Sequence, residues 1–339
     1  MGSGAFSKHT TNIQDIPPIS RQALGRIAWL GDLYDATTDR FCGVSIFQDK
    51  LLADSPAVRK TDNPYSNSKY ITANNLEEKF HELNVTGELR LSVLAGMCEL
   101  GGSAKYLGQD KTSFKSVEST QLWHIKTATE HLEINKAKQY KPISQKVMSR
   151  LGATHVVTEI EWGAKCVITA REETRTIKKK KEAQGGLFAW AWSKAKTMLG
   201  GDNTNEETEE RTDTIVEILG DVLPDGGLPQ TLEGAQAMMR NLPQTIKNCN
   251  EGKGKPLTYI MSPISHLVST KPSPPLKTFR SVDDAICLKV VRLFDAITES
   301  SQEVCVKQEL RKLLEKVRSA TEDVECLDAF CDKHLKITE

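Results

Sequence analysis

The residues best suited to proton transfer lie in one alternating run between Ala153 and Arg171. His155, Glu159 and Glu161 occupy every second position or a multiple of it, so in a strand they share one face. An imidazole beside a carboxylate can act as a general acid and base. The other interpretation is a solvated polar face, because neighbouring carboxylates on a half-exposed sheet usually meet water.

No catalytic motif accompanies these side chains. The chain has no phosphate-binding glycine loop, no nucleophile-elbow serine and no paired-histidine zinc helix. His124 and His131 are seven residues apart in a strand-like run, so they project to opposite faces as surface histidines. We therefore expect no enzyme activity, no catalytic residue, no cofactor and no metal site.

The cysteines do not form a metal or redox motif. None of the eight belongs to a Cys-x-x-Cys pair, and they are spread over the chain. Cys98 and Cys166 lie in apolar runs, which favours buried free thiols and a reducing compartment.

The most unusual stretch is residues 172–211, about forty residues between two expected strands, which is long for an irregular connection. Its lysine run could meet anionic lipid at about 1 kcal/mol per residue. It could equally form a solvated turn or pair with the acidic residues 206–210. The lipid-headgroup candidates are Lys178, Lys179, Lys180 and Lys181. The glycine pairs at hinge positions are Gly185, Gly186, Gly200 and Gly201.

The centre of this stretch is aromatic and apolar. In a strand, Phe188, Trp190 and Trp192 share one face, and indole rings between lysines suit a membrane interface. In a helix, Phe188 and Trp192 line one side and would pack on the domain core. The membrane-insertion candidates are Phe188, Trp190, Trp192, Met198 and Leu199.

Composition and charge exclude other classes of protein. The 339 residues are 38% hydrophobic and 27% charged with zero net charge, so no basic field for nucleic acid exists. No apolar run of about 18 residues could form a membrane-spanning helix. Residues 1–12 lack the apolar core of a signal peptide. We expect a chain that is cytoplasmic or released by a non-classical route.

Hydrophobic periodicity predicts an α+β protein. Runs with a period of two begin at Glu88, Val117, Ala153 and Thr212 and predict four strands of an antiparallel sheet with one exposed face. A fifth strand is predicted from Lys255 to Ser262. One helix should begin after the cap Asn75, and another should lie between Pro229 and Pro243.

The chain divides into four parts. Residues 1–22 should form a flexible arm, 23–270 the main domain, 271–279 a proline-containing linker and 280–339 a helical segment. The apolar stripe of residues 282–317 must be covered, either by the main domain or by a partner.

Four segments in order resemble proteins of the stonustoxin type with a MACPF/CDC-like domain. They are Leu24-Gly25-Arg26 through Trp29-Leu30-Gly31-Asp32-Leu33-Tyr34-Asp35, Gly102-Ser103-Ala104-Lys105-Tyr106-Leu107, Ala153-Thr154-His155-Val156-Val157-Thr158, and Pro256 through Ile264. The resemblance covers about residues 20–270. It implies that the helical tail corresponds to the start of the family's helical domain, which fuller members follow with thioredoxin-like and PRY/SPRY domains.

The resemblance implies a bent four-stranded antiparallel sheet flanked by two helical clusters. The first cluster would lie near residues 101–116 and the second near residues 172–211. Gly101 and Gly102 would then be hinge candidates beside a strand bend, or part of an ordinary bulge.

The same resemblance implies a pore-forming, cytolytic toxin that oligomerises and inserts amphipathic β-hairpins from both clusters into a membrane. The expected partners are further copies of the chain, a lipid membrane and, as a candidate, a second protein component. The alternative is a non-lytic scaffold that uses its helical tail to bind a partner or to dimerise.

Overall fold

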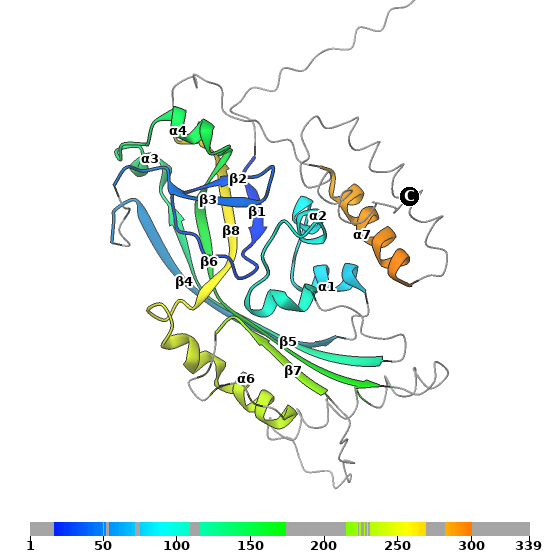
Figure 1. Cartoon of the computed structure of the whole chain (residues 1–339). Coiled ribbons are helices and arrows are strands. Elements are labelled where there is room, and N and C mark those ends of the chain that lie inside the picture. The colour runs from blue at the N-terminus through cyan, green and yellow to red at the C-terminus, as the bar shows by residue number, and fades with distance from the viewer. Residues whose placement is uncertain are drawn as a thin grey trace, which may run out of the picture.

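The computed structural model describes residues 17–49, 51, 54–71, 75–108, 116–173, 187, 215–222, 224, 227, 229, 231–268 and 282–299. These residues form an α+β structure around an eight-stranded antiparallel sheet (Figure 1). The strands are β1 (Ile19–Gln22), β2 (Asp32–Asp35), β3 (Arg40–Ser45), β4 (Val58–Ile71), β5 (Ser116–Leu132), β6 (His155–Glu173), β7 (Ile215–Gly220) and β8 (Lys255–Pro263). The helices are α1 (Leu76–Glu82), α2 (Glu88–Leu94), α3 (Ile134–Ala137), α4 (Gln145–Arg150), α6 (Leu232–Lys247) and α7 (Asp284–Glu299), with the 3-10 helices η2 (Gly102–Gly108) and η4 (Ile264–His266).

Four strands, in the order β4-β5-β6-β7, form the bent centre of the sheet. β5 and β6, with 17 and 19 residues, confirm the strands predicted from Val117 and Ala153. The strands predicted from Thr212 and Lys255 are confirmed as β7 and β8.

The sheet bends at Gly163, where β6 changes its neighbour. β6 pairs with β8 up to Gly163 and with β7 from Cys166. A Cβ atom on Gly163 would lie 1.9 Å from the carbonyl oxygen of Ile125 on β5. Gly254 has a φ of +82°, and its own Cβ would lie 2.3 Å from the Gly163 carbonyl oxygen. Only glycine permits this approach of three backbones.

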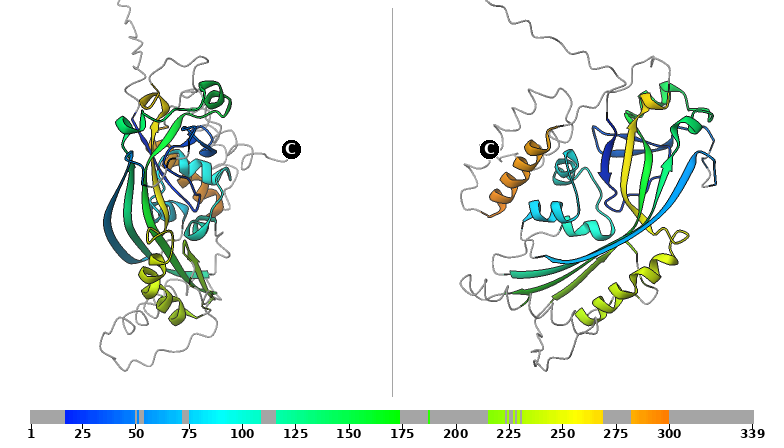
Figure 2. Two further views of the ribbon diagram at one scale, coloured as in Figure 1. Left: turned by 90° about the vertical axis from the view of Figure 1, so that its left-hand side faces the viewer. Right: turned by 180° about the vertical axis from the view of Figure 1, so that it is seen from behind.

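Helices cover both faces of the bent sheet (Figures 1 and 2). Leu122 and Val167 point toward α1, α2 and η2. Their neighbours along the strands, including Ile125 and Cys166, point to the opposite face and pack on α6. α7 lies outside α1 and α2, away from the sheet, as both views show.

The prediction of a strand that begins at Glu88 is wrong, because these residues form the helix α2. The prediction failed because it took the alternating polar residues to face solvent. Glu88, Arg90 and Ser92 are buried instead, and each has a charged or polar partner. The predicted position of the first cluster also needs correction, since α1 and α2 precede residues 101–116 and belong to the same group of helices.

The 14-residue strand β4 was not predicted from the sequence. Its side chains are mostly exposed, so no apolar face marks it. Backbone pairing with β5 holds it from Val58 to Ile71, with a register shift between Asp62 and Tyr65. Pro64 lies inside that shift on the edge of the sheet, where the missing N–H costs no ladder bond.

Two predicted boundaries differ from the structure. The helix expected to end before Pro243 continues as α6 to Lys247. Leu242 and Ile246 bury their side chains against the sheet on either side of the proline, and this packing keeps the helix intact. β1 lies within residues 1–22, the predicted flexible arm, and pairs with β8.

Gly163→Ala should destabilise the fold by about 2–4 kcal/mol, because its methyl group has no space beside the Ile125 carbonyl. Urea unfolding followed by circular dichroism measures this change. Gly43→Ala is the matched control: it has a φ of +69° but open space around it, so it should cost only about 1 kcal/mol. Equal losses in the two variants would contradict this account of the bend.

Candidate functional site: a helical cluster held against the sheet

Residues 75–108, which we call the first cluster, connect the end of β4 to the start of β5. They comprise α1, α2 and η2, none longer than seven residues. Helices this short are marginal in water, so tertiary contacts must hold them. Their apolar side chains form one buried core with Leu122 and Val167 of the sheet and with α7.

α1 takes its N-terminal hydrogen bonds from two sources. The side chain of Asn75 accepts from the Glu78 N–H, as predicted for a cap. The carboxylate of Asp295 on α7 accepts from the N–H groups of Leu76 and Glu77, at 2.9 and 3.1 Å. A distant helix therefore completes the cap of α1.

α7 also binds the first cluster through charges and apolar packing. Arg292 makes a two-pronged ion pair with Glu77 at 2.7 and 2.8 Å. Cys287, Val290 and Val291 are buried in the core that they share with the cluster. In its described part, the predicted apolar stripe thus has an intramolecular partner.

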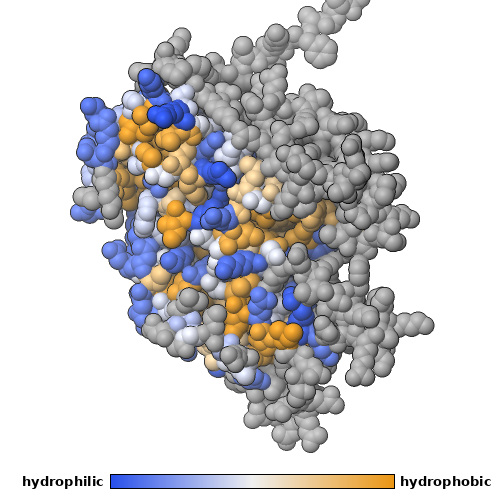
Figure 3. Space-filling model, in the orientation of Figure 1, coloured by the Kyte–Doolittle hydropathy of each residue, from blue (hydrophilic) through white to orange (hydrophobic). Residues whose placement is uncertain are grey.

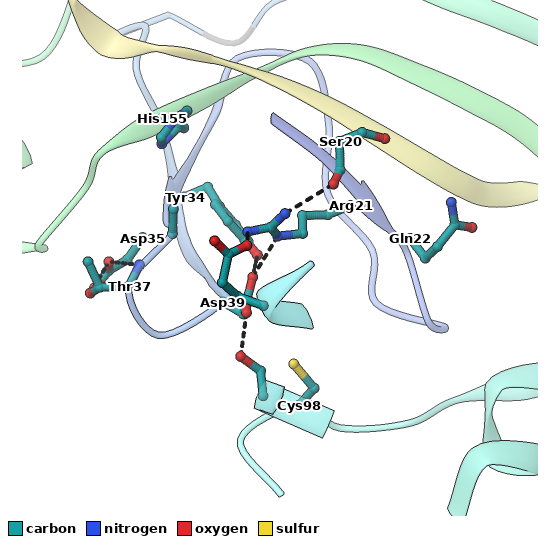
Figure 4. Close-up of polar contacts among 12 residues, drawn as sticks. Ser20, Arg21, Gln22, Tyr34, Asp35, Thr37, Asp39, Cys98 and His155 are labelled. Carbon is teal, nitrogen blue, oxygen red and sulfur yellow. Dashed lines mark hydrogen bonds and ion pairs between the residues drawn. The ribbon is translucent and has the colours of Figure 1, made fainter. Parts of the chain in front are cut away.

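A buried guanidinium joins α2 to the N-terminal strands (Figure 4). Arg21 on β1 makes 2.9 Å ion pairs with both Asp39 and Glu88, and its side chain is only 5% exposed. Burial alone would lower the pKa of Arg21, but Asp39, Tyr34 and Glu88 outweigh burial and raise it. The residue is therefore a permanent cation between two carboxylates.

Asp39 gathers two further donors at the turn between β2 and β3. The hydroxyls of Tyr34 and Ser92 both donate to its carboxylate, and Figure 4 shows Tyr34 beside Asp39. Burial and the nearby Asp39 charge raise the pKa of Tyr34 far above its ordinary value, so the phenol stays protonated. Asp39 thereby binds β1, β2 and α2 at one point.

A second polar junction joins η2 to the sheet at the end of β7. The carboxylate of Asp221 accepts from the backbone N–H groups of Ser103 and Lys165, at 2.9 and 2.7 Å. The ammonium of Lys165 donates to Gln22 and to the carbonyl oxygen of Leu83 behind α1. Burial lowers the pKa of Lys165 to about 8 and raises that of Asp221.

Gly101 and Gly102 lie at this junction. A Cβ atom on Gly101 would lie 3.3 Å from the Cα of Gly25, and one on Gly102 would lie 2.5 Å from Asp221. Both glycines therefore permit close packing, and a hinge function for them stays a prediction. No local sequence pattern identifies Asp221 as the partner, because the junction joins residues 118 positions apart.

The groups considered for acid–base chemistry do not converge. Glu161 pairs with Lys126, and Glu159 lies 3.2 Å from His131. The Nδ1 atom of His155 lies 2.8 Å from the Thr154 hydroxyl instead. Among the described residues, no group of three His, Cys, Asp or Glu side chains is placed to hold a metal ion.

The membrane candidates of the second cluster lie outside the described residues. These are Lys178, Lys179, Lys180, Lys181, Gly185, Gly186, Phe188, Trp190, Trp192, Met198, Leu199, Gly200 and Gly201. Their proposed roles therefore remain predictions. Within the described part of the chain, no helix is both long and apolar enough to span a bilayer.

A bent antiparallel sheet with short helices packed on its face is the arrangement of the MACPF/CDC-like fold. The solved structure titled "Stonustoxin structure" aligns with 95% of this chain and 43% of its own length, at a TM-score of 0.55 and 23% identity. The family "SNTX, MACPF/CDC-like domain" matches residues 18–271. The chain belongs to this family.

Curated relatives are named as toxins or toxin subunits. Neoverrucotoxin subunit beta of Synanceia verrucosa is 27% identical over 289 residues, which cover 82% of this chain and 40% of the relative. Cytolytic toxin-beta of Scorpaena plumieri is 25% identical over 305 residues, covering 85% and 42% respectively. The chain thus spans about two fifths of the length of these relatives.

Arg21→Met should destabilise the chain by about 3–5 kcal/mol, because it leaves the carboxylates of Asp39 and Glu88 buried without their cation. Urea unfolding measures the loss. Arg59→Met is the control, since Arg59 is 65% exposed and its ion pair with Glu133 should contribute at most about 1 kcal/mol. A small loss in Arg21→Met would show that the network is dispensable.

Stability should decline as the pH falls from about 6.5 toward 4. Burial and Lys165 lower the pKa of His124 to about 4, and burial and Arg21 lower that of His155 to about 4. Because the ordinary value is 6.5, the unfolded chain binds these protons first. Urea midpoints at several pH values measure the decline, and His124→Gln should reduce it. An unchanged decline in His124→Gln would exclude His124 as a contributor.

Proposed function

We propose that this chain is a membrane-attacking, pore-forming protein. It oligomerises on lipid, and its two helical clusters refold into amphipathic β-hairpins that insert into the bilayer. Membership of the SNTX, MACPF/CDC-like domain family and relatives named as cytolytic toxins and verrucotoxins support this proposal.

The observation that carries the proposal is the place of the first cluster between β4 and β5. These two strands are adjacent and antiparallel, and the chain leaves one and returns along the other through residues 75–108. A hairpin made from these residues would therefore extend an existing strand pair. Part of its backbone groups would form hydrogen bonds within the hairpin, and the outer edges would pair with neighbouring hairpins in a closed barrel, as a bilayer requires.

The edge strand β4 supports assembly through sheet edges. Among the described strands, β4 pairs with β5 alone, and its side chains are mostly exposed. A long unpaired edge is a template for a strand of another copy. Head-to-tail contacts of this kind close into rings when the rotation between copies allows it.

A second protein component remains part of the proposal. Several relatives are named as alpha or beta subunits, which suggests assembly from two kinds of chain. The non-lytic scaffold is less well supported, because α1 and α2 cover the described part of the apolar stripe that motivated it.

Dye release from liposomes tests the proposal, with negative-stain imaging of the same samples. Vesicles should include anionic lipid, because the lysine run of residues 178–181 is predicted to contact it. We expect leakage together with ring-shaped or arc-shaped oligomers. A protein that stays monomeric and leaves vesicles of every composition intact, alone or mixed with a candidate second subunit, would refute pore formation and favour the scaffold.

A further inference from the structure

The register of β4 and β5 fixes how a hairpin made from the first cluster would pair. From Tyr65 opposite Lys126 to Ile71 opposite Thr120, each step forward on β4 matches one step back on β5, without a slip. Continuing the same count places Leu89 opposite Gly102 and Leu91 opposite Leu100. Directly opposite residues share one face of an antiparallel pair.

In this register, apolar side chains from both halves of the cluster would lie on the same face of the hairpin. The first half contributes Val85, Gly87, Leu89, Leu91, Val93 and Ala95. The second half contributes Cys98, Leu100, Gly102, Ala104 and Tyr106. None of these side chains carries a charge, and Tyr106 would lie at one end, where aromatic rings favour the interface.

The opposite face is mainly polar. It contains Thr86, Glu88, Arg90 and Ser92 from the first half, and Glu99, Ser103 and Lys105 from the second. Leu94 and Met97 are its apolar members, and they would flank the turn at Ala95–Gly96, where glycine permits a positive φ.

A slip of one residue destroys this separation. It would place Glu99 opposite Leu91 and Lys105 opposite Val85, so charges would enter the apolar face. Because a one-residue slip exchanges the faces of a strand, the sequence itself selects the register that β4 and β5 already have.

We infer that residues 85–106 are the membrane-crossing hairpin of the first cluster, with lipid on the face of Leu89, Leu91 and Leu100. This inference rests on the proposed pore-forming function and assigns its residues. Each strand would have about eleven residues, the length that a tilted strand needs to cross the hydrocarbon layer.

The folded chain hides most of the apolar face of this hairpin and part of its polar face. Val85, Leu89, Leu91, Cys98 and Tyr106 are buried in the core between the sheet and α7. Glu88 and Arg90, from the polar face, are buried too, and they pair with Arg21 and Asp284. The same alternation that predicted a strand from Glu88 is therefore present in a segment that folds as α2.

Two arginine substitutions test the face assignment. Leu100 and Glu99 are neighbours at nearly the same depth of the hairpin, but they fall on the lipid face and the polar face respectively. Leu100→Arg should reduce the rate of dye release at least tenfold, since a cation at mid-bilayer on a lipid face is strongly unfavourable. Glu99→Arg should retain leakage within about threefold of the native chain, since a lumen face accepts charge at that depth.

The outcomes separate this inference from the proposed function. Native protein that never causes leakage would overturn both. Leaking native protein with equal effects of the two substitutions would overturn the face assignment and leave pore formation intact. Thermal unfolding in solution identifies a variant that loses leakage by failing to fold.

Disulfide formation tests the register with exposed residues only, so it does not depend on the core variants. Thr86 and Lys105 lie directly opposite in the proposed hairpin, where Cβ atoms are close enough for a disulfide. Thr86→Cys/Lys105→Cys should form the bond at least tenfold more on leaking vesicles than in solution. The offset pair Thr86→Cys/Glu99→Cys should not. Mass spectrometry identifies the linked peptides, and linkage of the offset pair alone, or no increase for either pair, would overturn the register.

Discussion

The ion pairs of Arg21 are the interaction on which the arrangement of the first cluster depends. One guanidinium joins β1 to the turn after β2 through Asp39, and to α2 through Glu88. A buried charge is tolerated only with such partners, so the three segments must come together at once. Removing any one of them would leave an uncompensated charge in the interior. The network thus fixes where α2 lies on the sheet, which its short length alone could not do.

The sequence revealed the parts of the fold that have one apolar face. β5, β6, β7, β8 and α1 follow from alternation or from a cap. β4 could not be predicted from the sequence, because backbone hydrogen bonds hold it on β5 while most of its side chains face solvent. The polar contacts of the site could not be predicted either, since Asp221 and Ser103 are 118 residues apart and no local pattern links them.

The error at α2 has a physical origin that bears on function. A segment with a two-residue alternation is a strand unless other contacts bury its polar positions. Here Glu88 and Ser92 obtain partners that make the helix acceptable. The local preference and the folded conformation therefore disagree, which is consistent with the proposed refolding of this segment into a hairpin.

The cap of α1 by Asp295 also constrains how the protein is made. The N–H groups of Leu76 and Glu77 find their acceptor 219 and 218 residues further along the chain. A ribosome that adds about 5–20 residues per second needs at least ten seconds to supply it. For most of that interval β4 and α1 have left the ribosome, while the helix that completes their packing does not yet exist. Nascent chains would therefore expose the apolar residues of the first cluster until synthesis has passed α7.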